Sequence, residues 1–267
     1  MTAIILGFIS GIIFGLTGSG GGILATPFLM YGLGLPIHHA ISITLLTLSF
    51  TGIVGSVKLF KIITPLWQEV AIIALTGTIA SLIGSLLNPL MPARELALVF
   101  AVVLLAIGYT VWTNSAAQHA PVTDNAVRKR YGVLCLVGIG AGFLNGFLGI
   151  SGGVIIVSSL IILMRYPMRE AAAISIMIVT IISIISTISH FFFSWRTIHW
   201  DITIAFVFSS CVGMFIAAHF AHLLPEKYIK KGLAVIILAL GISMLTTDLI
   251  SDESGIRALY EHLDRNW

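Results

Sequence analysis

The stretch GFISGIIFGLTGSGGG at residues 7–22 has a counterpart in GIGAGFLNGFLGISGG at residues 138–153. When the two stretches are aligned without a gap, six glycines of the first fall on six of the second, namely Gly7, Gly11, Gly15, Gly18, Gly21 and Gly22 on Gly138, Gly142, Gly146, Gly149, Gly152 and Gly153. Six glycines rarely coincide in one ungapped alignment by chance. The match therefore indicates an internal repeat, and we call this pairing of the two stretches the repeat alignment.

The repeat extends over nearly the whole chain. The repeat alignment also places Pro36 on Pro167, and with a slip of two positions it places Trp67 on Trp200. We therefore divide the chain into a first membrane repeat, a cytoplasmic linker, a second membrane repeat and a solvated C-terminal tail, at residues 1–113, 114–131, 132–250 and 251–267.

The composition is that of a membrane protein. Of 267 residues, 58% are hydrophobic and 9% are charged, whereas a soluble domain has about 25% charged residues. A helix of about 20 apolar residues crosses the hydrocarbon core of a bilayer. The sequence therefore predicts an all-α polytopic protein whose uninterrupted spans lie at about 40–60, 67–90, 94–113, 169–191, 199–222 and 229–249.

Several other classes of protein do not fit the residue pattern. The net charge of +3 comes from basic residues in short connectors, so no nucleic-acid partner is expected. Cys135 and Cys211 lie in apolar surroundings without a CxxC motif, so neither a metal site nor a disulfide is expected. No HExxH motif and no paired intramembrane carboxylates are present, and we expect neither an enzyme nor a cofactor.

The segment that contains the glycine cluster, at about 4–34 and again at 135–165, cannot be one straight helix. About 30 helical residues would measure about 45 Å, too long for one upright crossing and too short for two. The segment either crosses once with an unwound middle or enters the membrane and returns as two half-helices.

The distribution of Lys and Arg distinguishes these two topologies. A single crossing makes the two repeats parallel and divides the 14 basic residues 8 to 6. A re-entrant hairpin inverts the repeats and places 10 of the 14 on one side: Lys58, Lys61, Arg128, Lys129, Arg130, Arg165, Arg169, Lys227, Lys230 and Lys231. Because basic loops stay in the cytoplasm, the count favours inverted repeats with a cytoplasmic linker and both termini outside.

The two glycine clusters are candidate anion sites. A half-helix that begins directly after each cluster directs its unpaired N–H groups and its positive dipole end into the protein. Spaced glycines also let helices pack closely, and we assign packing to the spaced glycines and binding to the clusters. The predicted binding residues are Gly18, Ser19, Gly20, Gly21 and Gly22 in the first cluster, and Gly149, Ile150, Ser151, Gly152 and Gly153 in the second.

Other polar residues could line the same cavity. Asn145 precedes the second cluster, and hydroxyl residues at helical spacing follow each cluster, among them Thr47 and Thr51, and Thr180 and Ser183. The alternative is that these hydroxyls only bond the backbone of their own helix.

Two ionisable residues, Lys58 and His190, are candidates for proton coupling. They occupy nearly corresponding ends of the second segment in each half, and ionisable groups within membrane segments are usually functional. The alternative for His190 is a hydrogen-bonded residue at the membrane interface.

The motif G-x3-G-x2-G-x-G-G-G at residues 11–22, its echo GFLNGFLGISGG at residues 142–153, and the stretch from His190 to Trp200-Asp201 resemble the TauE/SafE family of sulfite-exporter-like membrane proteins. The resemblance covers almost the full length. It differs at Ser151, because the second half of the family usually carries a full triple glycine there, and this leaves open whether the two loops contribute equally.

The resemblance implies transport of small sulfur-containing anions, such as sulfite, sulfoacetate or related organosulfonates, coupled to a gradient of protons or Na⁺. We therefore expect a secondary transporter in the cell (inner) membrane. The alternative is a passive anion channel, or a permease for another small anion, which could use the same helix ends.

Overall fold

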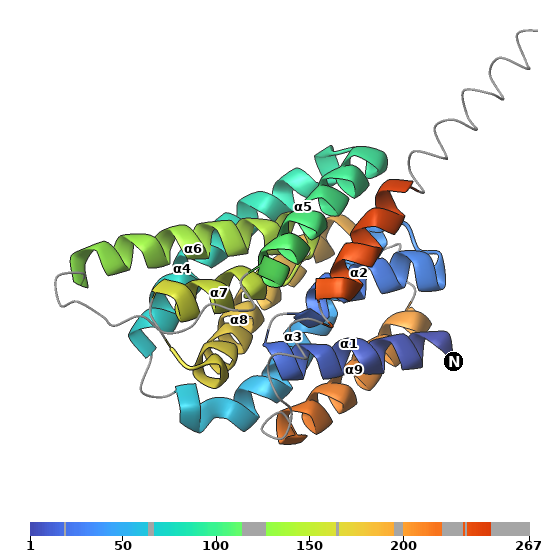
Figure 1. The fold of residues 1–267 in the computed structure, drawn as a ribbon. Helices are drawn as coiled ribbons and strands as arrows, with labels where there is room; N and C mark the ends of the chain where they lie inside the picture. The colour runs from blue at the N-terminus through green and yellow to red at the C-terminus, as the bar shows by residue number, and fades with distance from the viewer. Residues whose placement is uncertain are drawn as a thin grey trace, which may run out of the picture.

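The computed structural model describes residues 1–18, 20–63, 67–113, 127–163, 166–194, 200–220, 232 and 234–246. Throughout these ranges the regular structure is helical (Figure 1), which confirms the predicted all-α fold. The elements are α1 (Thr2–Thr17), α2 (Gly20–Leu33), α3 (Ile37–Ile63), α4 (Trp67–Leu87), the short η2 (Asn88–Leu90), α5 (Ala93–Thr113), α6 (Val127–Leu148), α7 (Gly153–Leu163), α8 (Met168–Ser194), α9 (Trp200–Phe220) and a C-terminal helix (Ala234–Thr246).

The helix boundaries follow the predicted repeat. The repeat alignment places both ends of α3 on the ends of α8, and the alignment of Trp67 with Trp200 does the same for α4 and α9. One boundary differs from the prediction, because α6 begins at Val127 and residues 127–131 of the predicted linker are helical. Between Pro121 and Gly132 the chain contains no helix breaker, and its Arg and Lys residues favour helix.

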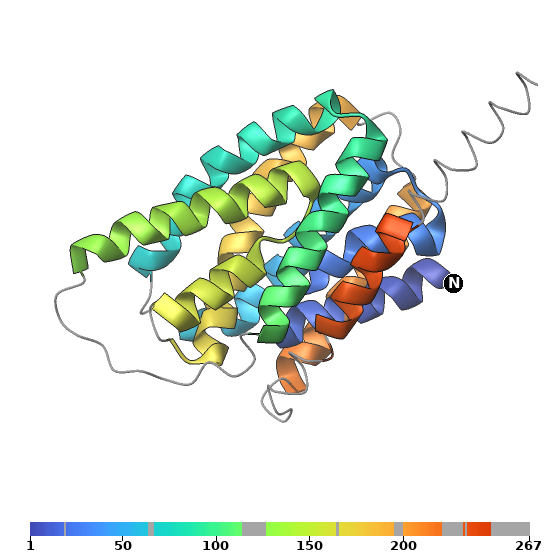
Figure 2. The same ribbon diagram turned by 45° about the horizontal axis from the view of Figure 1, so that its top comes forward.

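Each glycine-interrupted segment is a helical hairpin. Helix α2 runs back along α1, so that Gly21 faces Phe14 and Gly32 faces Leu6. A segment that crossed once would separate Gly32 from Leu6 by the length of both helices. In the second half, α7 returns beside α6 (Figure 2). The structure therefore has the hairpin alternative and not the single broken crossing.

Helices of one half pack on helices of the other half. Helix α1 lies along α9, and α6 lies along α4 (Figure 1). Small residues let these pairs approach: Gly142 faces the Gly77 backbone in the α4–α6 pair, and Gly11 faces the Ser210 backbone in the α1–α9 pair. These pairs correspond under the repeat, because α1 is equivalent to α6 and α9 to α4.

Helices α3 and α8 cross at the centre and run antiparallel. The hydroxyl oxygens of Ser49 and Thr187 lie 3.1 Å apart, and those of Ser56 and Thr180 lie 3.4 Å apart. Because the residue number rises along α3 as it falls along α8, these equivalent helices point in opposite directions. Inverted repeats require this arrangement, whereas the orientation of the halves in a membrane stays a prediction.

Six of the described helices are long and apolar enough to cross a membrane. Five of them correspond to predicted spans, and the sixth is α6, which is longer than a half-helix because of its early start. The predicted span 229–249 is described only over Ala234–Thr246. The membrane-spanning stretches of α3 and α8 are the most enclosed, because 67% of each stretch is buried, against 39–44% in the other four helices. Helices α3 and α8 therefore form the centre.

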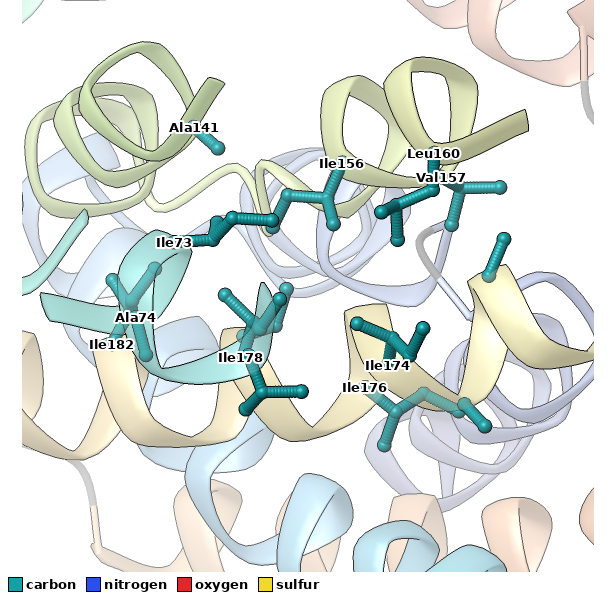
Figure 3. Packing of buried hydrophobic residues seen from close by; sticks show 14 of the residues in the cluster. Ile73, Ala74, Ala141, Ile156, Val157, Leu160, Ile174, Ile176, Ile178 and Ile182 are labelled. Carbon is teal, nitrogen blue, oxygen red and sulfur yellow. The ribbon is translucent and has the colours of Figure 1, made fainter. Parts of the chain in front are cut away.

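Branched apolar side chains fill the space between α4, α7 and α8. Figure 3 shows Ile73 of α4 and Ile156 of α7 directed toward the row of isoleucines on α8, among them Ile174 and Ile178. These side chains are fully buried. Their packing fixes α7, and with it the second glycine loop, against α8.

The close approach of α4 and α6 gives a first prediction. A methyl group added by Gly142→Ala would meet the carbonyl of Gly77, and crowding of this kind costs about 1–3 kcal/mol. The matched control is Gly140→Ala on the same helix, where a methyl group meets no atom within 4 Å and gains about 1 kcal/mol of helix propensity. We expect the thermal unfolding midpoint of the purified protein to fall for Gly142→Ala and to hold or rise for Gly140→Ala. Equal midpoints would contradict the close packing.

Candidate functional site

The first glycine loop is a left-handed turn that needs glycine. Helix α1 ends at Thr17, and Gly18 has φ +69° with its N–H donating to the Phe14 carbonyl at 2.8 Å, an αL cap. A Cβ at Gly18 would lie 2.6 Å from Cα of Ala172 on α8. Both the backbone angle and the space therefore exclude larger residues. Ser19, which the sequence pattern assigned to this site, lies outside the described residues.

The second glycine loop repeats this turn after α6. Gly149 has φ +67°, its N–H donates to the Asn145 carbonyl at 2.9 Å, and Gly152 has φ +57°. Ile150 and Ser151, between these glycines, are 0% and 1% exposed. A loop without side-chain exposure is part of the protein interior, so its polar groups must be satisfied there.

The two loops touch each other, which the sequence could not show. A Cβ at Gly22 would lie 2.8 Å from Cβ of Ser151 and 2.8 Å from Cδ1 of Leu48 on α3. The first turn of α2 therefore packs directly on the second loop. All the predicted glycines with described burial are buried, namely Gly18, Gly21, Gly22, Gly149, Gly152 and Gly153.

Two helix amino ends meet at this contact. The first amides of a helix have no partner within it, and they carry partial positive charge. In α7 the regular hydrogen bonds begin where the Gly152 carbonyl accepts from Ile155 and Ile156, at 3.0 and 3.2 Å. Helices α1, α2 and α7 contain no Lys or Arg. The amino ends of α2 and α7 therefore carry the partial positive charge of the backbone dipole without a basic side chain on their own helices.

Side chains from three elements hold the last carbonyls of α6. The Gly146 carbonyl accepts a hydrogen bond from Nε2 of His190 at 2.9 Å and from Oγ of Ser85 at 3.5 Å. The Phe147 carbonyl accepts from Nδ2 of Asn88 at 2.6 Å. These bonds satisfy the orphan carbonyls at the helix end. They also fix the position at which the second loop begins.

Asn88 is a site residue that the sequence pattern did not predict. It is 2% exposed, and its Oδ1 accepts from Nδ1 of His38 at 3.0 Å, so it joins the start of α3 to the end of α6. It lies directly before Pro89 at the end of a predicted span. This position suggests a helix end but gives no sign of the long-range contact.

Asn145 is one of the predicted site residues, and both ends of its side-chain amide are hydrogen-bonded to α8. Its Nδ2 donates to Oγ of Ser183 at 3.0 Å, and its Oδ1 accepts from Oγ of Ser186 at 3.1 Å. The structure thus brings Asn145 and Ser183 together. Ser186 was missed, although its spacing of three from Ser183 places both hydroxyls on one helix face.

The predicted threonines make different contacts. Thr47 donates to the Ile43 carbonyl at 2.7 Å and Thr180 to the Ile176 carbonyl at 2.6 Å, so both bond their own helix, as the alternative interpretation held. The Thr51 hydroxyl lies 3.8 Å from Sγ of Cys211 on α9. Contact of these residues with substrate stays a prediction.

Lys58 and His190 lie toward opposite ends of the molecule. Each belongs to the last turns of its helix, and α3 and α8 run antiparallel. Nζ of Lys58 donates to the Phe215 carbonyl at 2.9 Å and stands 4.0 Å above the Phe215 ring. Lys58 thus contacts α9, whereas His190 contacts α6 beside the second loop.

Paired hairpins with buried helix breaks, enclosed by apolar helices, define a multi-pass membrane protein with the architecture of a transporter. The chain matches the family described as Sulfite exporter TauE/SafE over residues 3–244, and it belongs to that family.

The relatives are described as probable membrane transporter proteins. One from Xylella fastidiosa is 30% identical over 88% of this chain and 91% of its own length. YunE of Bacillus subtilis is 23% identical over 93% of this chain and 98% of its own length. MJ0441 of Methanocaldococcus jannaschii is 28% identical over 70% of each chain. No solved structure matches the chain significantly. The protein is therefore a membrane transporter of the TauE/SafE family.

The enclosed turn at Gly152 gives a second prediction. Gly152→Ala would be disfavoured by the positive φ and by collision with the Ala141 carbonyl, whereas Gly34→Ala meets no atom within 4 Å at a similar φ of +68°. The backbone angle alone costs about 1–2 kcal/mol for a residue other than glycine. We expect the unfolding midpoint to fall clearly further for Gly152→Ala than for Gly34→Ala. Equal losses would show that Gly152 is not enclosed.

Proposed function

We propose that the protein is a secondary transporter of small sulfur-containing anions, sulfite or an organosulfonate such as sulfoacetate, in the cell (inner) membrane. Membership of the sulfite exporter family supports the substrate class. The observation that carries the proposal is the buried contact between Gly22 and Ser151, where the amino ends of α2 and α7 meet.

The proposed site suits a sulfite or sulfonate group. Three oxygens of such a group accept hydrogen bonds from several directions, and the amino ends of two helices offer N–H donors. Glycines at these ends let the oxygens approach the backbone closely. Ser151, where the second half of the family usually carries glycine, makes the two halves of the site chemically different.

The two halves would cross the membrane in opposite directions. The antiparallel crossing of α3 and α8 supports this topology, as does the division of Lys and Arg into 10 and 4. Inverted repeats place a shared site near the middle of the membrane and allow it to open to one side at a time. The linker would then be cytoplasmic.

His190 is the proposed link between substrate and protons. Because the Gly146 carbonyl only accepts, Nε2 of His190 carries a proton in their 2.9 Å bond, and a second proton would bind at Nδ1. The resulting positive charge would face the carboxyl end of α6, which favours cations. Lys58 at the other end of the molecule is the second candidate, and Na⁺ is the alternative coupling ion.

A passive anion channel, or a permease for another small anion, is the alternative function. A conducting pore needs a continuous water path. The direct contact between the two loops favours a transporter with an enclosed site.

Ligand binding gives a third prediction. We expect sulfite or a sulfonate to raise the thermal unfolding midpoint of the purified protein, because a ligand that binds only the folded state stabilises it by about 2.7 kcal/mol at 100 times its Kd. Chloride and neutral analogues at matched ionic strength should leave the midpoint unchanged. A response to none of the sulfur anions would contradict the substrate class.

Proton coupling gives a fourth prediction. His190→Gln keeps an N–H donor for the Gly146 carbonyl but cannot bind a proton, so anion flux into proteoliposomes should persist and lose its response to an imposed pH gradient. The matched control is His38→Gln, which keeps a donor for Asn88 and should retain the response. A full response in His190→Gln would remove His190 from the coupling and favour Lys58.

A further inference from the structure

Helices α3 and α8 meet along a row of hydroxyl groups, which we call the seam. It contains two pairs across the interface, Ser49 with Thr187 and Ser56 with Thr180. The repeat alignment places Ser49 on Thr180 and Ser56 on Thr187, so each pair is the equivalent of the other. Two turns of helix separate the pairs, a distance of about 10 Å.

The midpoint of the seam lies at Gly52 and Ser183, which correspond under the same alignment. The Ser183 hydroxyl accepts a hydrogen bond from the side chain of Asn145. The backbone carbonyl of Asn145 accepts one from the N–H of Gly149 at the start of the second loop. The midpoint is therefore joined to the proposed anion site, with one hydroxyl pair on each side of it.

The helix pairs that pack most closely join one sequence half to the other. Helices α4 and α6 touch through the backbones of Gly77 and Gly142, and α1 and α9 touch through those of Gly11 and Ser210. Such backbone contacts leave no room for sliding. Helix α4 therefore belongs with the second half and α9 with the first (Figure 1).

Two packing units follow from these contacts. We assign α1, α2, α3 and α9 to one unit and α6, α7, α8 and α4 to the other. Helix α3 contacts α9 and α8 contacts α4, although the contact between α3 and α8 is more extensive than either. The units meet at the seam. There Gly52 faces mainly the side chain of Thr180, whereas Gly18 at the end of α1 faces backbone atoms of Ala172 on α8. The units therefore meet through side chains at the seam and through backbone at Gly18.

One end of the seam opens to the surface. A groove of about 490 Å³ is lined by Leu46, Thr187, Ile188, Phe191 and Phe192. Thr187 is itself a member of the first hydroxyl pair, and Ile188 and Phe192 are 52% and 84% exposed. The groove thus reaches Thr187, one member of the Ser49–Thr187 pair.

We propose that the substrate path runs along the seam and that the two hydroxyl pairs are its two gates, which open alternately as the two units tilt against each other. Ser49 and Thr180 already donate to carbonyls of their own helices, so a parted pair offers the hydroxyl of Thr187 or Ser56 as a hydrogen-bond donor to a small oxyanion. The identity of the substrate rests on the proposed function, whereas the gates rest on the packing of α3 and α8.

A disulfide across the first gate tests the path. In a chain with Cys135→Ala and Cys211→Ser, the pair Ser49→Cys and Thr187→Cys replaces two hydroxyls 3.1 Å apart, close enough for a disulfide after small adjustments. We expect oxidation to reduce the flux of a sulfonate such as sulfoacetate in proteoliposomes to the level of empty liposomes, and reduction to restore it. A formed disulfide with undiminished flux would overturn the proposal.

A matched control lies inside one unit. Thr26 and Thr44 join α2 to α3 with their hydroxyl oxygens 3.0 Å apart, and both residues are 0% exposed. The pair Thr26→Cys and Thr44→Cys should form its disulfide and keep its flux. Loss of flux in this control as well would mean that any cross-link stops the protein, which would remove the support for gates at the seam.

Labelling of single cysteines tests the gates without a known substrate. A small membrane-impermeant maleimide should label Thr187→Cys from one face of sealed vesicles and Thr180→Cys from the opposite face, with Thr26→Cys protected from both. Labelling of both seam positions from the same face, or protection of all three, would overturn the gates. If the wild-type protein moves none of the tested anions, the proposed function fails and the labelling still decides the seam.

Discussion

The structure depends on one constraint, which is that a backbone broken inside an apolar protein must find hydrogen bonds there. At the end of α6 the carbonyls of Gly146 and Phe147 are satisfied by His190 and Asn88. Both hairpins close through left-handed glycines whose amides cap the preceding helix. The carboxyl ends are thus occupied by protein groups, whereas the first amides of α2 and α7 have no partner within their own helices. The proposed anion would bind at the point where these helices meet.

The spacing of the glycines determines how the helices that contain these breaks pack. Glycines at every fourth residue let α1 lie against α9 and α6 against α4, with helix backbones in direct contact. Because each pair joins the two sequence halves, the two hairpins are drawn together and Gly22 reaches Ser151. The exchange of α4 and α9 leaves α3 and α8 as the central contact between the packing units. The same small residues therefore determine both the site and the interface at which movement is proposed.

Much of the fold could be predicted from the sequence, because periodicity and length are local signals. The alignment that matched the glycines also places the ends of α3 on those of α8, and the length of the glycine segments required a break. The partners of each helix could not be predicted, because they depend on tertiary packing. The role of Asn88 was hidden for this reason. The directions of the Thr47 and Thr51 hydroxyls depend on side-chain rotamers, which residue spacing does not determine.

The central claim is that the anion lies between the amino ends of α2 and α7. The most direct measurement is an experimental structure of the protein with selenite, a heavier analogue of sulfite whose selenium can be located by anomalous scattering. We expect a selenium peak beside the Gly22–Ser151 contact, with oxygens within hydrogen-bond distance of the first amides of both helices. A peak at a basic side chain such as Lys58, with the two loops still in contact and no anion between them, would contradict it.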